Sequence, residues 1–384
     1  MPQIAIAVVG MGFGSDFAPI YARHPDVARV GIADTDRRRL DAVGDRLGIA
    51  DRFATLGEVL ASGRYDAVHL TTPVRLHTDQ SVAVLEAGLH CACAVPMATT
   101  IEDLRRIISA QRAAGRNYMM METMVYGREY LYAADLHSRG ELGGLTFLRG
   151  FHLQDLHGYP PYWMSYPPMT YSTHALSPLL AISGARVQTV SCLGSGILQD
   201  QYAGDWENHF PLETAHFRLD KDNLAAEVTL SFFQTARQYQ EGFNVYGDRA
   251  GVEWALLGED EMWLHSFTEA AAGARREVDV QRIDPPDRAD LLPGEIADFV
   301  QPTTYTPAGA REPITVGAGH GGSHPHLADE FVRSIVEHRP PRVDALTAAN
   351  WTAPGIVGHA SAQRDGALLA VPQFTEADPL GTTP

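Results

Sequence analysis

A strand that turns into a helix near the N-terminus constrains the fold more than any other part of the sequence. The β-forming residues 4–9 lead into Gly10-Met-Gly-Phe-Gly14, and a helical pattern follows. At such a junction in a parallel sheet, glycines permit the tight turn and leave room beside the backbone for a pyrophosphate. The segment therefore predicts a dinucleotide-binding domain, with Gly10, Gly12, Phe13 and Gly14 as cofactor-binding residues.

The residue after the next strand indicates which dinucleotide binds. The strand expected at 28–33 ends at Asp34, which is close to the usual spacing for a carboxylate that binds both ribose hydroxyls. Arg37, Arg38 and Arg39 follow and could hold the 2′-phosphate of NADP. Because the carboxylate would repel that phosphate, we favour NAD over NADP.

Composition limits the class of protein. A chain of 384 residues is long enough for two domains, and its formal charge of -17 argues against nucleic acid and anionic membranes as partners. Cys91, Cys93 and Cys192 are too few for a disulfide framework, so we expect core thiols. With no leader pattern and no apolar run of membrane-spanning length, we expect a soluble, cytoplasmic protein. Lys221 is the only lysine, and it lies in a predicted hairpin turn.

The order of predicted elements divides the chain into two domains. Residues 1–124 alternate strands and helices, as in an α/β Rossmann domain with a doubly wound parallel sheet. Residues 125–384 form an α+β substrate and oligomerisation domain, whose C-terminal helices could pack back on the first domain. Its predicted strands are typical of a large, mostly antiparallel sheet: 145–153, 187–193, 212–219, 224–233, 241–246 and 251–256. Residues 284–324 are rich in Pro and Gly, and we expect an irregular lid or binding loop there.

Two motifs follow consecutive strands at the carboxyl edge of the predicted parallel sheet, where ligands of such sheets bind. They are Thr72-Pro-Val-Arg-Leu-His77 and Ala94-Val-Pro-Met-Ala98. With the glycine turn, they resemble the T-P-x-x-x-H and E-K-P motifs of the Gfo/Idh/MocA oxidoreductases. The resemblance implies cofactor-binding roles for Thr72, Pro73, His77, Val95 and Pro96, although His77 could instead stabilise the loop. In that family the lysine of E-K-P is central to hydride transfer, whereas here Val95 replaces it.

Three further stretches resemble the NAD-dependent α-N-acetylgalactosaminidases of the same superfamily. Tyr171-Ser-Thr-His174 is similar to their Y-P-T-H motif, Met119-Met-Met-Glu122 precedes a tyrosine, and the third stretch is Gly150-Phe-His-Leu-Gln-Asp155. That family also has V-P where others have K-P. The resemblance implies one set of catalytic residues: His174, Tyr171, His152, Glu122 and Asp155, with Glu122 also at the cofactor.

Each of these residues also has a purely structural interpretation. His174 could cap a helix or satisfy a core carbonyl, Tyr171 could be a packed aromatic, and Asp155 could be a turn residue. Glu122 could pair with an arginine. His152 lies where the glycosidase family has a functional tyrosine, so its role stays open.

The resemblance implies a NAD-dependent glycoside hydrolase. In this reaction NAD takes a hydride from C3 of the sugar, a base removes the acidified C2 proton, the aglycone leaves, water adds and the hydride returns. Histidine and tyrosine suit the proton transfers near neutral pH. The alternatives are a net sugar or inositol dehydrogenase and a non-catalytic NAD-binding regulator.

The remaining expectations concern substrate, metal and assembly. We expect a carbohydrate substrate bound by residues that offer aromatic rings or a cation: Tyr126, Arg128, Tyr159, Tyr162 and Trp163. His320, His324 and His326 lack a cysteine or acidic partner at a recognised zinc spacing, so we expect no metal. Family resemblance alone implies a homodimer or homotetramer that forms through the large sheet.

Overall fold

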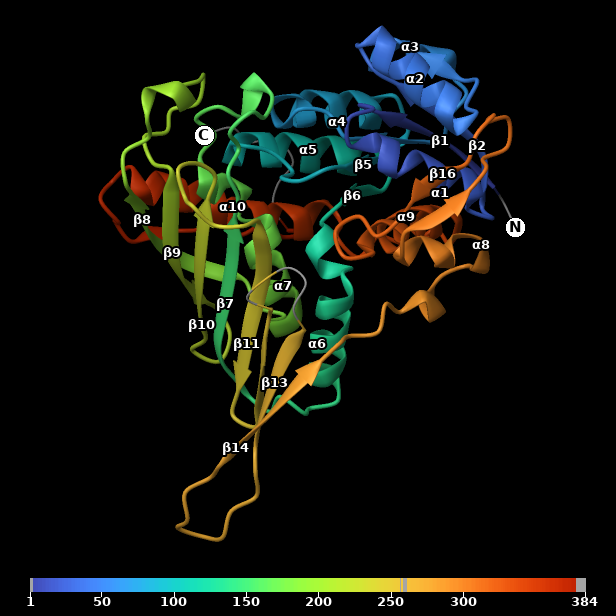
Figure 1. Ribbon diagram of the computed structural model, residues 1–384. Coiled ribbons are helices and arrows are strands. Elements are labelled where there is room, and N and C mark those ends of the chain that lie inside the picture. The colour runs from blue at the N-terminus through green and yellow to red at the C-terminus, as the bar shows by residue number, and fades with distance from the viewer. Residues whose placement is uncertain (1–2, 256, 258–260, 378–384) are drawn as a thin grey trace. The chain divides into compact units, whose positions relative to one another are not determined.

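The computed structural model describes residues 3–255, 257 and 261–377, so Leu256, the predicted end of one strand, lies outside them (Figure 1). The chain forms two compact units. Unit 1 contains residues 1–127, 287–349 and 374–384, and unit 2 contains residues 128–286 and 350–373. Residues 287–349, which the sequence places in the second domain, thus belong to unit 1.

Unit 1 is a Rossmann domain, as predicted. Its sheet has six strands in the order β3-β2-β1-β4-β5-β6, and all neighbours are parallel. The strands are β1 (Ile4–Val9), β2 (Val27–Ala33), β3 (Arg52–Phe53), β4 (Ala67–Leu70), β5 (His90–Cys93) and β6 (Tyr118–Met120). The helices are α1 (Ala18–Arg23), α2 (Arg37–Leu47), α3 (Leu56–Ser62), α4 (His77–Glu86), α5 (Ile101–Ala114), α8 (Gly294–Ala297) and α9 (Ser323–Val336).

Local sequence explains these boundaries. The central strands are apolar because both faces of the sheet are buried, and Ile6, Val8 and Leu70 have no exposed surface. Helix α5 begins where the Thr100 side chain accepts the backbone N–H of Asp103, and it ends at a left-handed glycine. The free cysteines, Cys91, Cys93 and Cys192, are buried as predicted.

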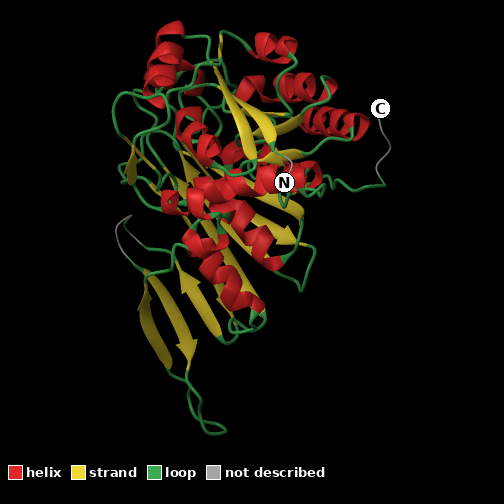
Figure 2. Ribbon diagram, turned by 90° about the vertical axis from the view of Figure 1, so that its right-hand side faces the viewer, coloured by secondary structure: helices red, strands yellow, loops and turns green. Residues whose placement is uncertain are grey.

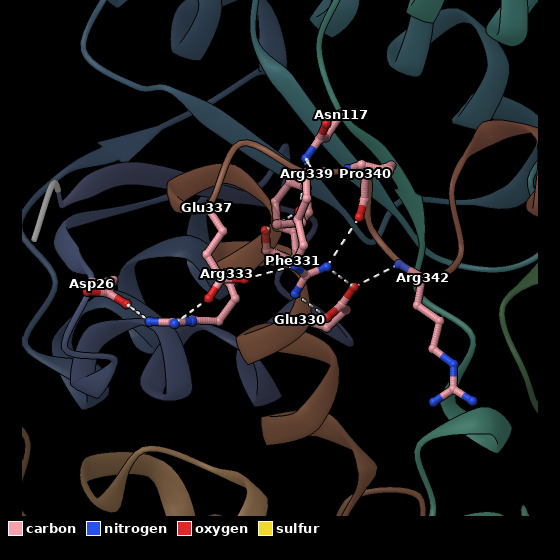
Figure 3. Close-up of polar contacts among 10 residues, drawn as sticks. Asp26, Asn117, Glu330, Phe331, Arg333, Glu337, Arg339, Pro340 and Arg342 are labelled. Atoms are coloured by element: carbon pink, nitrogen blue, oxygen red, sulfur yellow. Dashed lines mark hydrogen bonds and ion pairs between the residues drawn. The ribbon is translucent and has the colours of Figure 1, made fainter. Parts of the chain in front are cut away.

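An ion-pair network fixes helix α9 within unit 1 (Figure 3). Arg333 lies between Asp26 and Glu337, and its Nη1 is 3.1 Å from Asp26 Oδ2. Arg339 pairs with both oxygens of Glu330 at 2.7 Å and also contacts Glu337. Because the Asp26 carboxyl lies in the turn before β2, this network ties the C-terminal segment to the Rossmann sheet.

Unit 2 contains a nine-stranded sheet in the order β14-β13-β12-β11-β7-β10-β9-β8-β17 (Figure 1). All neighbouring pairs are antiparallel except β7 and β10, which agrees with the predicted sheet. The strands are β7 (Leu145–Leu153), β8 (Val187–Ser195), β9 (Leu212–Leu219), β10 (Ala225–Ser231), β11 (Gln240–Gly247), β12 (Ala250–Glu253), β13 (Met262–Phe267), β14 (Val278–Ile283) and β17 (Leu369–Ala370). Helix α6 (Arg128–Ser138) opens the unit, and α7 (Thr173–Ser183) packs on β7, β10 and β11.

Two regions differ from the sequence-based expectation. Strands β13 and β14 were not predicted, and they form a hairpin that projects from the end of the sheet (Figure 2). Residues 284–324 are not wholly irregular, because they contain α8 and a small hairpin of β15 (Thr303–Tyr305) and β16 (Ile314–Val316).

Helix α10 (Ala345–Ala362) begins in unit 1 and ends in unit 2. Within the described part of the chain, no helix has the length and apolar character needed to cross a membrane.

Candidate active site

The glycine turn after β1 has the geometry of a dinucleotide cradle. Gly10 adopts a φ of 99°, and a Cβ there would lie 2.7 Å from the carbonyl oxygen of Thr71. A Cβ on Gly14 would lie 2.6 Å from Thr71 Oγ1, whereas the nearest atom to one on Gly12 would be Arg39 Nη1 at 4.0 Å. Gly10 and Gly14 are thus required by the packing of the turn, and Gly12 leaves its outer side clear for a phosphate group. The Thr71 hydroxyl, which the sequence analysis did not single out, donates to the Gly10 carbonyl at 2.6 Å.

Asp34 lies at the end of β2 beside this turn. Its Oδ2 accepts the backbone N–H of Met11 at 2.7 Å, and its Oδ1 accepts that of Asp36 at 2.7 Å. Arg39 Nη1 lies 3.3 Å from Asp34 Oδ2, while Arg37 pairs instead with Asp41. The carboxylate therefore holds the turn and is positioned at the strand end where the ribose hydroxyls of NAD bind.

His77 joins the two strand-end motifs. Its Nδ1 lies 2.8 Å from the carbonyl oxygen of Pro96, and its Nε2 lies 2.9 Å from that of Thr72. Both contacts are satisfied by donors only if the ring carries two protons. Burial lowers the pKa of His77, but the neighbouring Cys93 and the two carbonyls outweigh burial and raise the pKa to about 9. His77 is buried, and its hydrogen bonds hold the Thr72 and Pro96 segments together at the carboxyl edge of the parallel sheet.

This pKa predicts a loss of stability in alkaline solution. The unfolded imidazole has a pKa of about 6.5, and the folded one about 9, so its stabilising effect is complete below about pH 6.5 and is lost as the pH rises through about 9. Between about pH 6 and pH 10, the free energy of unfolding should fall by about 3 kcal/mol more in the wild type than in His77→Gln. Urea unfolding at both pH values measures the difference. Parallel pH profiles for the two proteins would contradict it.

Glu122 and Tyr126 lie at the end of β6 in unit 1. Glu122 is fully buried, and its Oε1 accepts the backbone N–H of Met124 at 3.0 Å, so it caps the short turn that follows the strand. Tyr126 is also buried, with the Arg342 guanidinium 5.9 Å from its ring centroid. Thr72, the first residue of the motif that ends at His77, donates its hydroxyl to Gln80 Oε1 at 2.5 Å.

In unit 2 the fold brings together three predicted residues from three elements. His152 lies on β7, Tyr171 ends the 3₁₀ turn Pro168–Tyr171, and His174 lies in the first turn of α7. The His152 ring is 5.7 Å from the His174 ring and 6.0 Å from the Tyr171 ring, and the last two rings are 5.2 Å apart. His152 and His174 are both almost completely buried. They form an acid–base cluster within the core of the unit.

A carboxylate that the sequence analysis missed lies between the two histidines. Glu241 is on β11, directly opposite His152 in the antiparallel register. Its Oε1 lies 3.5 Å from Nδ1 of His174 and 3.9 Å from Nδ1 of His152. Its Oε2 accepts the hydroxyl of Tyr239 at 2.8 Å. The sequence shows only a glutamate at the start of a predicted strand, two residues after a tyrosine, so no local motif marks Glu241.

The protonation state of Tyr239 completes this cluster. Burial, together with the neighbouring Glu241 carboxylate, raises the pKa of Tyr239 far above its usual value. The phenol therefore keeps its proton and serves as a donor to Glu241.

A second set of contacts connects His152 with the surface. His152 Nε2 lies 3.2 Å from Gln154 Oε1, and the Gln154 amide donates to the Tyr159 hydroxyl at 2.9 Å. Hydrogen bonds thus lead from the buried cluster to a residue whose side chain is 46% exposed.

Aromatic side chains border the cluster. The Trp163 ring is 5.5 Å from that of Tyr171 and 5.6 Å from that of Tyr162, which is 40% exposed. Tyr159 and Tyr162 are therefore available at the surface, and Trp163 connects Tyr162 to the cluster. Such a wall suits the apolar face of a sugar ring.

Two predicted site residues lie apart from this cluster. Asp155 is exposed in the turn after β7, where its Oδ1 accepts the backbone N–H of His157 at 3.2 Å. Arg128 begins α6, and its guanidinium pairs with Glu129 at 3.2 Å and Asp284 at 2.8 Å. Both side chains have local structural contacts in this structure.

A buried ion pair supports the segment that carries Tyr171. Glu213 on β9 has no exposed surface, its Oε1 is 2.7 Å from Nδ1 of His359, and its Oε2 accepts the backbone N–H of Met169 at 2.7 Å. Although burial lowers the pKa of His359, the contact with Glu213 raises it above its usual value. The Glu213–His359 pair thus holds the short 3₁₀ turn Pro168–Tyr171 in place.

Gly150 controls the distance between β7 and α7, which gives a test of how tightly the cluster is built. A Cβ at this position would lie 2.1 Å from the carbonyl oxygen of Ala175, next to His174. Gly150→Ala should therefore displace α7, lower the stability by about 1–3 kcal/mol and reduce activity. At Gly144, which precedes the same strand, the nearest atom to an added Cβ is 3.5 Å away, so Gly144→Ala is the matched control. Thermal unfolding and activity assays compare them; unchanged stability and activity in Gly150→Ala would exclude this role.

His320 and His326, which lie near the start of α9, have contacts other than a metal ion. His320 Nδ1 lies 3.1 Å from His324 Nε2, and His326 Nε2 lies 3.4 Å from the carbonyl oxygen of Asp287. Across residues 3–255, 257 and 261–377, no group of three or more His, Cys, Asp or Glu side chains is arranged to hold a metal ion.

Comparison with known proteins agrees with this geometry. Residues 4–122 match the family described as "Oxidoreductase family, NAD-binding Rossmann fold". Over these residues the chain is similar to the Gfo/Idh/MocA oxidoreductases. Its cofactor is NAD.

Curated relatives extend the similarity over almost the whole chain. A protein of Streptomyces niveus named glycosyl hydrolase family 109 protein is 22% identical over 98% of this chain and 78% of its own length. A protein of the same name from Streptomyces coelicolor is 27% identical over 97% of this chain and 84% of its own length. The crystal structure of a levoglucosan dehydrogenase with NADH and levoglucosan has a TM-score of 0.74 and 17% identity, over 97% of this chain and 100% of that one. At this identity the structural likeness shows the fold.

Val95 is the residue at which this chain differs from the Gfo/Idh/MocA motifs in a way that affects proton transfer. It occupies the place of the E-K-P lysine, is 6% exposed and precedes a cis peptide bond to Pro96. An apolar side chain cannot transfer a proton, so any proton transfer must be carried out by other side chains of this chain.

Proposed function

We propose that this enzyme of the Gfo/Idh/MocA family is a NAD-dependent glycoside hydrolase that acts by transient oxidation at C3 of a sugar. The observation that carries the proposal is the cluster of His152, His174 and Glu241, because it offers paired proton acceptors in a chain whose E-K-P lysine is replaced by Val95. Names of relatives over most of the chain point in the same direction.

The N-terminal unit has the residues to hold the cofactor. Gly10, Gly12 and Gly14 would receive the pyrophosphate and Asp34 the adenosine ribose. When bound, NAD supplies a hydride acceptor for C3 and returns the hydride at the end of each turnover. His77 supports the neighbouring segments through its hydrogen bonds to Thr72 and Pro96.

Unit 2 would supply the proton transfers. The reaction needs one base for the C3 hydroxyl and one for the C2 proton, and the cluster contains two imidazoles. Glu241 faces Nδ1 of His174 at 3.5 Å, which favours a proton on that nitrogen and leaves Nε2 as the basic atom. The same carboxylate would stabilise the imidazolium that forms when His174 accepts a proton.

Two tyrosines have different roles in this scheme. Tyr171 lies beside both imidazoles and would donate its hydroxyl to the oxygen that gains negative charge during elimination. Tyr239 keeps its proton and holds Glu241 in place through a hydrogen bond of 2.8 Å. Trp163, Tyr159 and Tyr162 would bind the sugar ring, so the substrate class is a carbohydrate glycoside.

Net oxidation of a sugar is a second candidate, favoured by one observation. The His174–Glu241 pair could replace the absent lysine as the acceptor of a hydroxyl proton, which is all that a dehydrogenase requires besides NAD. A non-catalytic regulator has no need for this buried acid–base cluster.

A panel of α- and β-nitrophenyl glycosides separates these candidates. The enzyme is incubated with each glycoside, with and without NAD in catalytic amount, while nitrophenol and NADH are followed by absorbance. The proposal predicts NAD-dependent nitrophenol release without lasting NADH. Steady NADH formation without nitrophenol would instead identify a dehydrogenase, and unaltered glycosides and free sugars would identify a regulator.

A further inference from the structure

We propose that His320 is a cofactor-binding residue, whose imidazole donates a hydrogen bond to the pyrophosphate of NAD. It lies within unit 1 but far along the chain from the glycine turn, in the segment between β16 and α9. The inference rests on the backbone of this segment, its contact with the turn and the hydrogen bond that orients the ring.

The backbone around His320 adopts a conformation that a side chain normally avoids. His320 has a φ of 45° and Ala318 a φ of 58°, and glycines with positive φ occupy positions 317, 321 and 322. A non-glycine residue in this region costs on the order of 1 kcal/mol or more, and such residues gather at ligand sites. The positive φ alone assigns no function, because His338 shares it; the contacts of the His320 ring with the dinucleotide turn distinguish the two histidines.

The ring of His320 contacts the dinucleotide turn itself. Its centroid is 5.6 Å from that of Phe13, edge to face, and Phe13 is part of Gly10-Met-Gly-Phe-Gly14. The His324 ring packs on the same side chain at 5.4 Å. Because His320 is exposed and lies against this turn, its ring is within reach of an anion bound there.

His324 sets the orientation and the proton of His320. Burial, together with the neighbouring histidines, lowers the pKa of His324 well below its usual value, so this ring is neutral. When Nε2 of His324 donates to Nδ1 of His320, at 3.1 Å, the remaining proton of His320 is on Nε2. Nε2 is then a donor whether His320 is neutral or protonated, as a phosphate oxygen requires.

The rest of the surrounding segment is built for this arrangement. A Cβ on Gly319 would lie 2.3 Å from the His324 ring, so only glycine allows the chain to pass here. Asp16 is the acidic group that faces His320, and burial raises the pKa of its carboxyl.

Nucleotide binding to His320→Asn tests the proposal. Asparagine tolerates positive φ, so the backbone can be kept while the imidazole is removed. We expect the Kd of NAD⁺ and of ADP-ribose, measured by calorimetry on protein freed of nucleotide, to rise about tenfold, because one charge-assisted hydrogen bond is lost. The Kd of adenosine, which lacks the pyrophosphate, should not change.

His338→Asn is the matched control, since His338 also has a positive φ, of 56°, and lies elsewhere in unit 1. It should bind NAD⁺, ADP-ribose and adenosine as the wild type does. Unchanged binding of ADP-ribose to His320→Asn would overturn the proposal, as would an equal loss for adenosine, which would show a disturbed turn. No glycoside substrate is present in these measurements, so their result is independent of the reaction proposed above.

Discussion

Replacing His174 by glutamine is expected to lower kcat about a thousand-fold on the glycoside that the nitrophenyl panel identifies. A positioned general base contributes roughly 10²–10⁴ in rate, and His174 is the imidazole closest to the Glu241 carboxylate, at 3.5 Å. Glutamine can still form a hydrogen bond to Glu241 but accepts no proton at neutral pH. The loss should therefore appear in kcat, with the Kd of NAD unchanged.

His265→Gln provides the control for this substitution. His265 lies 3.8 Å from Glu253 on the same sheet, but its side chain is 32% exposed. Steady-state kinetics and thermal unfolding of both variants separate a catalytic loss from a folding defect. If His174→Gln keeps more than about a tenth of the wild-type kcat, His174 is not the general base.

Glu241→Gln is expected to lower kcat about a hundred-fold and to alter the pH profile. The amide can still accept the Tyr239 hydroxyl, which now donates to Glu241 Oε2 at 2.8 Å, so the local packing is preserved. It cannot stabilise an imidazolium at His174, and it no longer favours the productive tautomer. The acidic limb that reports the histidine in kcat/KM should therefore move to lower pH, because a neighbouring carboxylate favours the imidazolium and its removal makes the ring easier to deprotonate.

Glu253→Gln is the matched control for Glu241→Gln. Glu253 also accepts a tyrosine hydroxyl, that of Tyr246 at 2.8 Å, and also faces a histidine, but its side chain is 38% exposed. Rate and pH profile should both stay close to wild type in this control. An unshifted limb in Glu241→Gln, with kcat within a few-fold of wild type, would show that Glu241 has only a structural role.

The fold of unit 1 could be predicted because its signals are local. The β-forming run at residues 4–9, the glycines that follow and Asp34 lie within one strand-turn-helix-strand unit, and each is visible in the sequence alone. The same holds for the motif ending at His77 and for Val95. The sequence could not show that His77 joins the two strand-end segments, because each of its ring nitrogens contacts a carbonyl oxygen of a different segment.

Glu241 and Tyr239 could not be predicted because their importance arises from pairing between distant strands. Glu241 lies opposite His152 only through the register of β7 and β11, which are separated by four other elements of regular helix or strand. Local sequence shows a glutamate at the start of an ordinary strand. The exposed strand β14 was missed for another reason, since its residues show no alternation of buried and exposed positions.

The position of a solvent deuteron in the product tests the central claim most directly. The nitrophenyl glycoside that the enzyme accepts is hydrolysed in D₂O, and the released sugar is analysed by NMR and mass spectrometry. Transient oxidation at C3 with proton removal at C2 predicts one deuterium at C2 and none at C3, because the C2 proton is lost to solvent whereas the C3 hydride is stored and returned. A product without deuterium at C2 would contradict the account, because direct displacement at C1 leaves the C2 proton in place.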